Sequence, residues 1–172
     1  MTDSSNLALD KKNLDTILVL DFGSQYTQLI ARRIRELDVF SEILPWDISK
    51  EKIVALNPKG IILSGGPDSV TEANTPRIPE TVFELDIPIL GICYGMQTLA
   101  EQFGGQVTPS KAKEFGHAAI TIEQSSVLFD GFSPGSSIDV WMSHGDHVST
   151  LPDQFNLIAS TLEVSDTSLL PD

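Results

Sequence analysis

One stretch of this chain, residues 88–105, combines an apolar run, a sharp turn and a helical pattern: PILGICYGMQTLAEQFGG. The apolar run at 88–92 predicts a short buried strand, and an apolar stripe at i, i+3, i+4 and i+7 predicts a helix directly after it. The stripe consists of Met96, Leu99, Ala100 and Phe103. Glycines at 104 and 105 are of the type that commonly ends a helix. The strand and the helix therefore have to meet in a tight turn at Cys93.

Glycines stand two residues before and two residues after this cysteine, at Gly91 and Gly95. The spacing is the thiol counterpart of the G-x-S-x-G nucleophile elbow, in which small flanking residues let a strand and a helix come close together. The sulfur would then be exposed beside a helix N-terminus, whose dipole favours the reactive thiolate. A lone cysteine is more often a buried, inert residue. The flanking glycines favour the nucleophile interpretation for Cys93.

The rest of the first hundred residues alternates apolar runs with helical patterns. Runs at 16–20, 39–44 and 60–63 predict buried strands, and a helix with an apolar face is expected over 26–37. The residues of that face are Tyr26, Leu29, Ile30, Ile34 and Leu37. Such alternation predicts an α/β fold with a doubly wound, mostly parallel sheet and helices on both faces. Ligands of these sheets gather at the carboxyl ends of the strands.

Beyond Gly105 the pattern changes to short apolar segments between turns rich in Ser, Pro and Gly. The predicted short strands lie around Val107 and at 118–122, 138–142 and 157–160. They suggest a smaller antiparallel flank of the same domain. We therefore expect a polar, disordered tail over 1–15 and one domain over 16–172.

Charge and cysteine content exclude several classes of function. The formal charge is −13, with 11 basic and 24 acidic residues, which argues against binding to nucleic acid or to an anionic membrane. One cysteine cannot form an internal disulfide, and we expect a cytoplasmic protein, since nothing in the sequence resembles a signal peptide or a membrane span. Three histidines and one cysteine share no ligand spacing, so no metal site is expected.

The turn at Gly91–Gln97 resembles the nucleophile turn of class I glutamine amidotransferases, and more narrowly that of the amidotransferase domains of GMP synthases. Three further stretches resemble the same family and occur in its order. They are LDFGSQYTQLIARR at 20–33, SGGP at 64–67 and WMSHGD at 141–146. The resemblance covers nearly all of the chain after the tail. It implies a class I glutamine amidotransferase-like fold and hydrolysis of glutamine through Cys93.

The resemblance also implies roles for other residues. The backbone N–H groups of Gly66 and Tyr94 would hold the oxyanion that forms when Cys93 adds to the amide, although a purely structural turn at 64–67 is the alternative. The α-amino and α-carboxylate groups of glutamine would be held by Gln97 and by a loop at 143–146. The loop residues are Ser143, His144, Gly145 and Asp146. A polar hairpin turn is the alternative interpretation of this loop.

A general base is harder to find. The family takes it from a His-Pro-Glu segment near the end of the domain, which this sequence lacks, and the spacing of His144 and Asp146 is a weaker alternative. The domain is therefore interpreted as cut short at its C-terminus. The resemblance implies that a separate synthetase part, using ATP and Mg²⁺, would take the ammonia to convert XMP to GMP. The alternative is a non-catalytic glutamine-binding or regulatory module that lacks the His and Glu.

Overall fold

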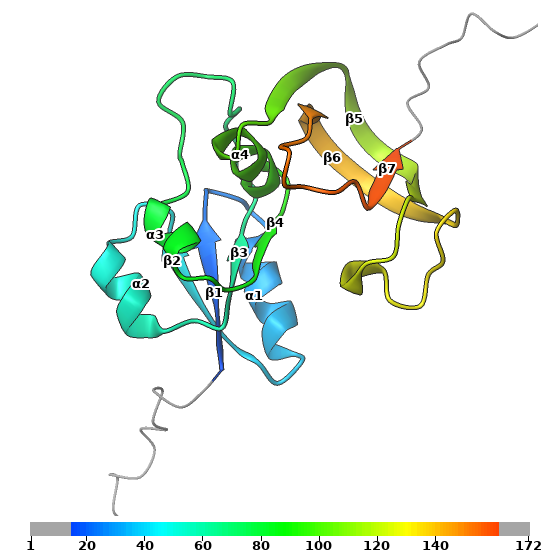
Figure 1. Cartoon of the computed structure of the whole chain (residues 1–172). Helices are drawn as coiled ribbons and strands as arrows, with labels where there is room; N and C mark the ends of the chain where they lie inside the picture. Colours follow the sequence, from blue (N-terminus) through cyan, green and yellow to red (C-terminus); the bar gives the residue numbers. More distant parts are fainter. Residues whose placement is uncertain (1–14, 162–172) are drawn as a thin grey trace, which may run out of the picture. The chain divides into compact units, whose positions relative to one another are not determined.

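The computed structural model describes residues 15–161, and at 110–115 and 144 it describes the backbone alone. The chain forms two compact units, the first ending at Phe103 and the second beginning at Gly104 (Figure 1). A tail was predicted over 1–15, and residues 1–14 of it lie outside the described residues. One domain over 16–172 stays a prediction. Within 15–161, no helix combines the length and the apolar character that crossing a membrane requires.

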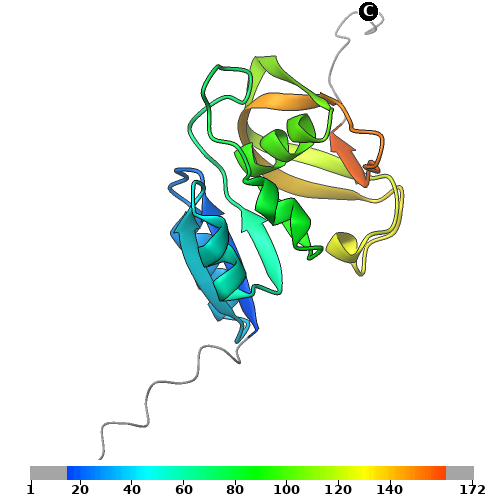
Figure 2. The ribbon, with the colours of Figure 1, turned by 60° about the vertical axis from the view of Figure 1, so that its left-hand side comes forward.

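The first unit alternates strands and helices. Its elements are β1 (Thr16–Asp21), α1 (Thr27–Arg35), β2 (Phe40–Pro45), α2 (Lys50–Leu56), β3 (Gly60–Leu63), α3 (Glu80–Glu84), β4 (Ile89–Gly91) and α4 (Tyr94–Gln102). The four strands are parallel and stand in the order β2-β1-β3-β4. The chain moves one way from β1 to β2 and the opposite way from β2 to β4. Right-handed crossovers then put α1 on one face and α2 and α3 on the other. Figure 2 shows the ribbon of α2 over one face of this sheet. The predicted doubly wound parallel fold is confirmed.

The centre of this sheet is the apolar core of the first unit. Leu18, Val19 and Leu20 on β1 are fully buried. On β3, Leu63 is fully buried and Ile61 is 1% exposed. A strand with neighbours on both edges and helices on both faces has no solvent-facing side, which is why its residues do not alternate. The uninterrupted apolar run at 16–20 therefore predicted this position correctly.

The apolar face predicted for the first helix is wrong in part. Tyr26, Leu29 and Leu37 are 54%, 46% and 77% exposed. The buried residues of α1 are Thr27 and Ala31, four positions apart on one side of the helix. The Thr27 hydroxyl donates to Oδ1 of Asp21 at the end of β1, at 2.8 Å. Small side chains bring the helix close to the sheet, so the larger apolar residues stand outside the contact.

The second unit is a small antiparallel sheet. Its elements are β5 (Gln106–Ile122), the short 3-10 helix η2 (Val127–Phe129), β6 (Ser137–Thr150) and β7 (Ala159–Thr161). The strand order is β6-β5-β7 (Figure 1). The expected antiparallel sheet is confirmed, but two of its strands are long where short ones were predicted.

The loop predicted at 143–146 is wrong, because these residues lie inside β6. Pro109 pairs with Asp146, and the next pair is Glu114 with His144. Residues 110–113 of β5 therefore stand opposite Gly145 alone, in an irregularity of the ladder. The polar, glycine-containing sequence that resembles a turn marks this bulge, and the strand continues through it.

The meeting of α4 with β3 supplies a test of the fold. A Cβ built on Gly95 would meet the carbonyl oxygen of Leu63 and come within 2.6 Å of its Cβ. Alanine gains about 1 kcal/mol over glycine in a helix, but overpacking against backbone costs about 1–3 kcal/mol or more. A backbone carbonyl cannot move aside as the end of a flexible side chain can, so the cost at Gly95 lies at the upper end of this range. Gly95→Ala should therefore lower the free energy of unfolding by about 1–2 kcal/mol in urea denaturation followed by circular dichroism.

The matched control is Gly145→Ala, because a Cβ at Gly145 would meet no heavy atom of the described residues within 4 Å. Its effect should stay within about 0.5 kcal/mol. Equal stability of the Gly95 variant and the unchanged chain would contradict the described packing of α4 on β3.

Candidate active site

The turn between β4 and α4 has the geometry of a nucleophile elbow. Cys93 stands directly before α4 with φ 49° and ψ −113°, a conformation that non-glycine residues rarely adopt. A Cβ on Gly91 would lie 2.6 Å from the Cα of Met96, and the Gly95 position is closed by Leu63. Both glycines are therefore required by close backbone approach. The result is a cysteine side chain presented to solvent at the tip of the turn.

A buried serine joins this elbow to the end of β3. The Oγ of Ser64 accepts the N–H of Phe22 at 3.0 Å and donates to the carbonyl of Gly65 at 2.9 Å. Its carbonyl accepts the N–H of Gly95 at 3.0 Å, and its own N–H donates to Leu20 at 3.0 Å. Ser64 is fully buried. This one residue therefore fixes the carboxyl ends of β1 and β3 to the first turn of α4.

The diglycine turn lies next to the cysteine. A Cβ on Gly65 would be 3.5 Å from the Cβ of Cys93, so the two backbones are close neighbours. A Cβ on Gly66 would lie 2.7 Å from the carbonyl oxygen of Phe22 and 3.3 Å from Cγ of Tyr94. The predicted oxyanion turn and the predicted nucleophile are thus brought together.

The two backbone donors assigned to the oxyanion remain available. Within residues 15–161, the recorded hydrogen bonds give the N–H of Gly66 and the N–H of Tyr94 no acceptor. The following residue differs, since Gly95 donates to both Ser64 and Ile92 at 3.0 Å. An oxyanion hole requires such available N–H groups near a nucleophile, here one in the turn after β3 and one at the start of α4.

The electrostatics of the thiol differ from the expectation. Burial raises the pKa of the Cys93 thiol above its ordinary value, although the residue itself is exposed. The walls of the elbow remove water from one side of the sulfur, which disfavours the charged form. The acidic thiol predicted from the helix dipole is therefore wrong in direction. Efficient attack needs a base in addition to the elbow.

The predicted apolar stripe of α4 is confirmed at Ala100, which is 5% exposed, and is wrong at Met96. Gln97 is 5% exposed and Thr98 is fully buried, whereas Met96 is 42% exposed. Phe103 instead makes an edge-to-face contact with Phe83, with ring centroids 5.0 Å apart. The helix itself and its glycine end are confirmed, because Gly104 follows with φ 90°. Gln97 lies one turn after Cys93, and its N–H donates to the carbonyl of Cys93 at 3.0 Å.

The other predicted substrate-binding residues all lie in the second unit. Ser143, Gly145 and Asp146 are consecutive with His144 on β6, at the irregularity opposite 110–113. The side chain of His144 lies outside the described residues. The structure therefore groups these four together, and it groups Gly66, Cys93, Tyr94 and Gln97 together in the first unit.

Two histidines have their partners within the second unit. Nε2 of His117 lies 3.2 Å from Oδ1 of Asp139, in an exposed contact. Nε2 of His147 lies 3.2 Å from the hydroxyl of Thr108. Both contacts join β5 to β6. The interpretation of His117 and His147 as surface or packing residues agrees with these positions.

Sequence reasoning missed the side chain of Tyr94. Its ring is 2% exposed and lies 5.5 Å from the ring of Phe22, and its hydroxyl donates to the carbonyl of Pro76 at 2.6 Å. Burial raises the pKa of this phenol, which keeps the hydroxyl protonated as a donor. The two residues are 18 positions apart in the sequence, so no local sequence pattern could predict this contact.

Comparison with known proteins gives a consistent result. The family model described as "Glutamine amidotransferase class-I" matches residues 18–167. A GMP synthase [glutamine-hydrolyzing] of Teredinibacter turnerae is 58% identical over 151 residues, which are 84% of this chain and 29% of that protein. The chain thus spans less than a third of the length of this curated relative.

Solved structures agree in fold. A candidate GMP synthase subunit from Thermoplasma acidophilum is 36% identical with a TM-score of 0.69, over 87% of this chain and 74% of that one. A glutamine amidotransferase from Thermotoga maritima is 22% identical with a TM-score of 0.63, over 84% of this chain and 66% of that one. The second likeness supports the fold alone.

The raised pKa of the thiol predicts the pH dependence of its reactivity. Only the thiolate reacts with iodoacetamide, and burial moves the appearance of the thiolate to higher pH. The alkylation rate of Cys93 should therefore rise through a midpoint above about 8.5, the value for a free thiol. Labelled protein can be counted by mass spectrometry, and Cys93→Ser should take up no label because the chain holds one cysteine. A midpoint below that of free cysteine would show that the helix dipole outweighs burial.

Proposed function

Because the chain belongs to the class I glutamine amidotransferase family, we propose that Cys93 is the nucleophile that attacks the side-chain amide of glutamine. The observation that carries the proposal is the elbow itself. A cysteine with positive φ stands between two glycines that close backbone contacts require. Two N–H groups that have no acceptor within 15–161 lie beside it. Strain of this kind is retained where the surrounding structure holds it in place, and it clusters at active sites.

The chemistry follows from the positions of these groups. The sulfur of Cys93 forms a bond to the amide carbon, and the carbonyl π electrons move onto oxygen. The N–H groups of Gly66 and Tyr94 donate to that oxygen and stabilise its charge. When the carbonyl re-forms, the C–N bond breaks, the nitrogen takes the proton that the thiol gave up to a base, and ammonia leaves. Water then hydrolyses the thioester to glutamate and restores the thiol.

The α-amino and α-carboxylate groups of glutamine would fix its orientation in the site. We assign its α-amino and α-carboxylate groups to Gln97 and to the strand segment Ser143, His144, Gly145 and Asp146. The bulge at Gly145 supports this assignment, since an irregular ladder re-aims side chains and frees backbone groups next to active sites.

The ammonia would serve amination of XMP to GMP. The 58% identity to a GMP synthase supports this choice, and the part of that protein beyond the matched 29% would supply a synthetase domain or subunit that uses ATP and Mg²⁺. No cofactor is assigned to the present residues. A reducing cytoplasm is the compartment in which a free, reactive cysteine persists.

A second candidate function is a glutamine-binding or regulatory module without turnover. The raised pKa of the Cys93 thiol makes attack depend on a base, which favours this candidate. His117 contacts Asp139 and His147 contacts Thr108, and neither histidine is assigned as that base. Both candidates require glutamine binding next to Cys93. They differ in whether ammonia is released.

The test follows glutamate formation from L-glutamine by the 172-residue chain, alone and mixed with a synthetase part, ATP, Mg²⁺ and XMP. The chain alone should show little turnover, because no base is assigned. L-glutamine should nevertheless slow alkylation of Cys93 by iodoacetamide, whereas D-glutamine should not. In the mixture, Cys93→Ala should abolish transfer of amide nitrogen to GMP.

If saturating L-glutamine leaves the rate of Cys93 alkylation unchanged, both candidates are contradicted. Protection without any nitrogen transfer in the mixture would favour the non-catalytic module.

A further inference from the structure

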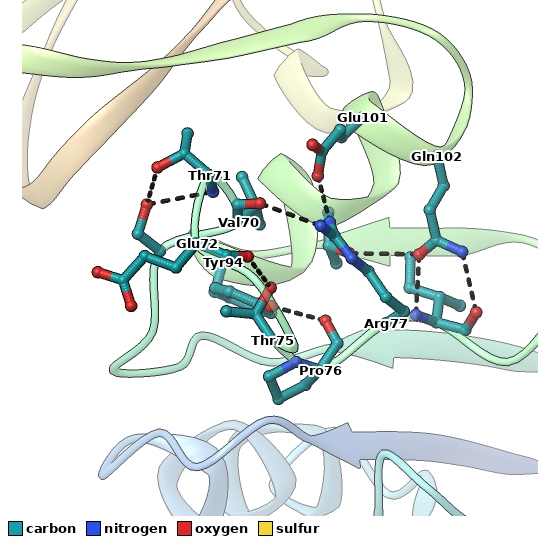
Figure 3. Close-up of polar contacts among 12 residues, drawn as sticks. Val70, Thr71, Glu72, Thr75, Pro76, Arg77, Tyr94, Glu101 and Gln102 are labelled. Atoms are coloured by element: carbon teal, nitrogen blue, oxygen red, sulfur yellow. Dashed lines mark hydrogen bonds and ion pairs between the residues drawn. The ribbon is translucent and has the colours of Figure 1, made fainter.

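The long connection between β3 and α3 is fastened to α4 by polar contacts near its end (Figure 3). The Tyr94 hydroxyl donates to the carbonyl of Pro76 at 2.6 Å. Gln102 makes two bonds to the backbone of Ile78, accepting its N–H at 2.8 Å and donating to its carbonyl at 3.0 Å. These contacts come from both ends of α4, and they hold the end of the connection at Pro76 and Ile78.

Arg77 adds a second fastening within the same connection. Its guanidinium pairs with the carboxylate of Glu101 on α4 and donates to the carbonyl of Val70 at 3.0 Å (Figure 3). One side chain therefore joins the middle of the connection, its end and the helix. We call these three side chains, Tyr94, Arg77 and Gln102, the α4 clamp.

The clamp closes a ring that contains both oxyanion donors. The connection spans 64–79, includes Gly66 near its start, and reaches α4 at 76–78, where the carbonyl of Pro76 accepts from the hydroxyl of Tyr94. From there the ring of Tyr94 leads back to Gly66, since a Cβ on Gly66 would lie 3.3 Å from its Cγ. Phe22 packs against the same aromatic ring at 5.5 Å. A shift of the connection at Pro76 would therefore change the position of Tyr94 relative to Gly66.

We propose that the α4 clamp positions the backbone N–H groups of Gly66 and Tyr94 for the developing oxyanion, with the Tyr94 hydroxyl as its central contact. The inference rests on the proposed function of Cys93. Donors of an oxyanion hole act by being held in place before the charge develops, so small displacements lower the rate and leave ground-state binding unchanged. Arg77 and Gln102 are positioning residues in this scheme, since they touch neither substrate nor sulfur.

The test uses a glutamine analogue in which a chloromethyl ketone replaces the side-chain amide. The sulfur of Cys93 bonds to the methylene carbon, and chloride leaves with the electron pair. The ketone oxygen accepts hydrogen bonds from the same two N–H groups during the step. Tyr94→Phe keeps the aromatic ring and the backbone N–H but loses the bond to Pro76. It should lower the inactivation rate constant kinact about three- to tenfold while KI stays within twofold.

Gln102→Leu is the second variant, because it removes both bonds to Ile78 at the other end of α4. We expect a similar fall in kinact with unchanged KI. The pH midpoint of alkylation by iodoacetamide should stay unchanged in both variants, since neither side chain faces the sulfur.

The matched control is Glu36→Gln, which breaks exposed ion pairs with Arg32 and Arg33 on α1 and leaves the clamp intact. Its kinact and KI should equal those of the unchanged chain. Urea unfolding midpoints of all variants show how far each change acts through stability.

An unchanged kinact in both clamp variants, or a fall that the control shares, would overturn the inference. So would equal losses in kinact and binding, because they would indicate general loosening of the pocket. If the unchanged chain shows no saturation with the analogue, the proposed function of Cys93 fails instead, and the two failures are thereby distinguished.

Discussion

The first unit depends on one close approach between backbones, where α4 begins against the end of β3. Gly95 lies on the carbonyl of Leu63, and Gly91 lies against the backbone of Met96. Only hydrogen fits at either position, so the chain between them has to turn sharply and Cys93 takes a positive φ. The strained cysteine is a consequence of the packing of α4 on the sheet, and the remaining site is arranged around it.

The groups that surround Cys93 form a site that can stabilise an oxyanion. Ser64 connects two strand ends to α4, and Gly66 lies where a side chain would strike Phe22. Among the residues that the structure describes, the N–H groups of Gly66 and Tyr94 are thereby left without acceptors beside a thiol. The same enclosure raises the pKa of that thiol, so the geometry favours stabilisation of the oxyanion while ionisation of Cys93 is disfavoured. Turnover therefore needs a base beyond the elbow.

The elbow could be predicted from sequence because its cause is local: glycine spacing and an apolar run followed by a helical pattern. The parallel sheet was predictable for the same reason, through the buried run of β1. Residues 143–146 were mistaken for a loop because only the pairing of β6 with β5 shows that the ladder continues past Gly145. The contact of Tyr94 with Pro76 also depends on tertiary structure, and apolar periodicity gave no indication that Gln97 would be buried where Met96 is exposed.

If the elbow works as proposed, a carbonyl oxygen bound next to Cys93 lies between two specific donors. A crystal structure of the chain whose Cys93 carries the ketone left by the chloromethyl ketone analogue would show this directly. We expect the ketone oxygen at about 3 Å from the backbone nitrogens of both Gly66 and Tyr94. An oxygen that points to solvent, or that is bound by other donors while these two nitrogens stay unpaired, would contradict it.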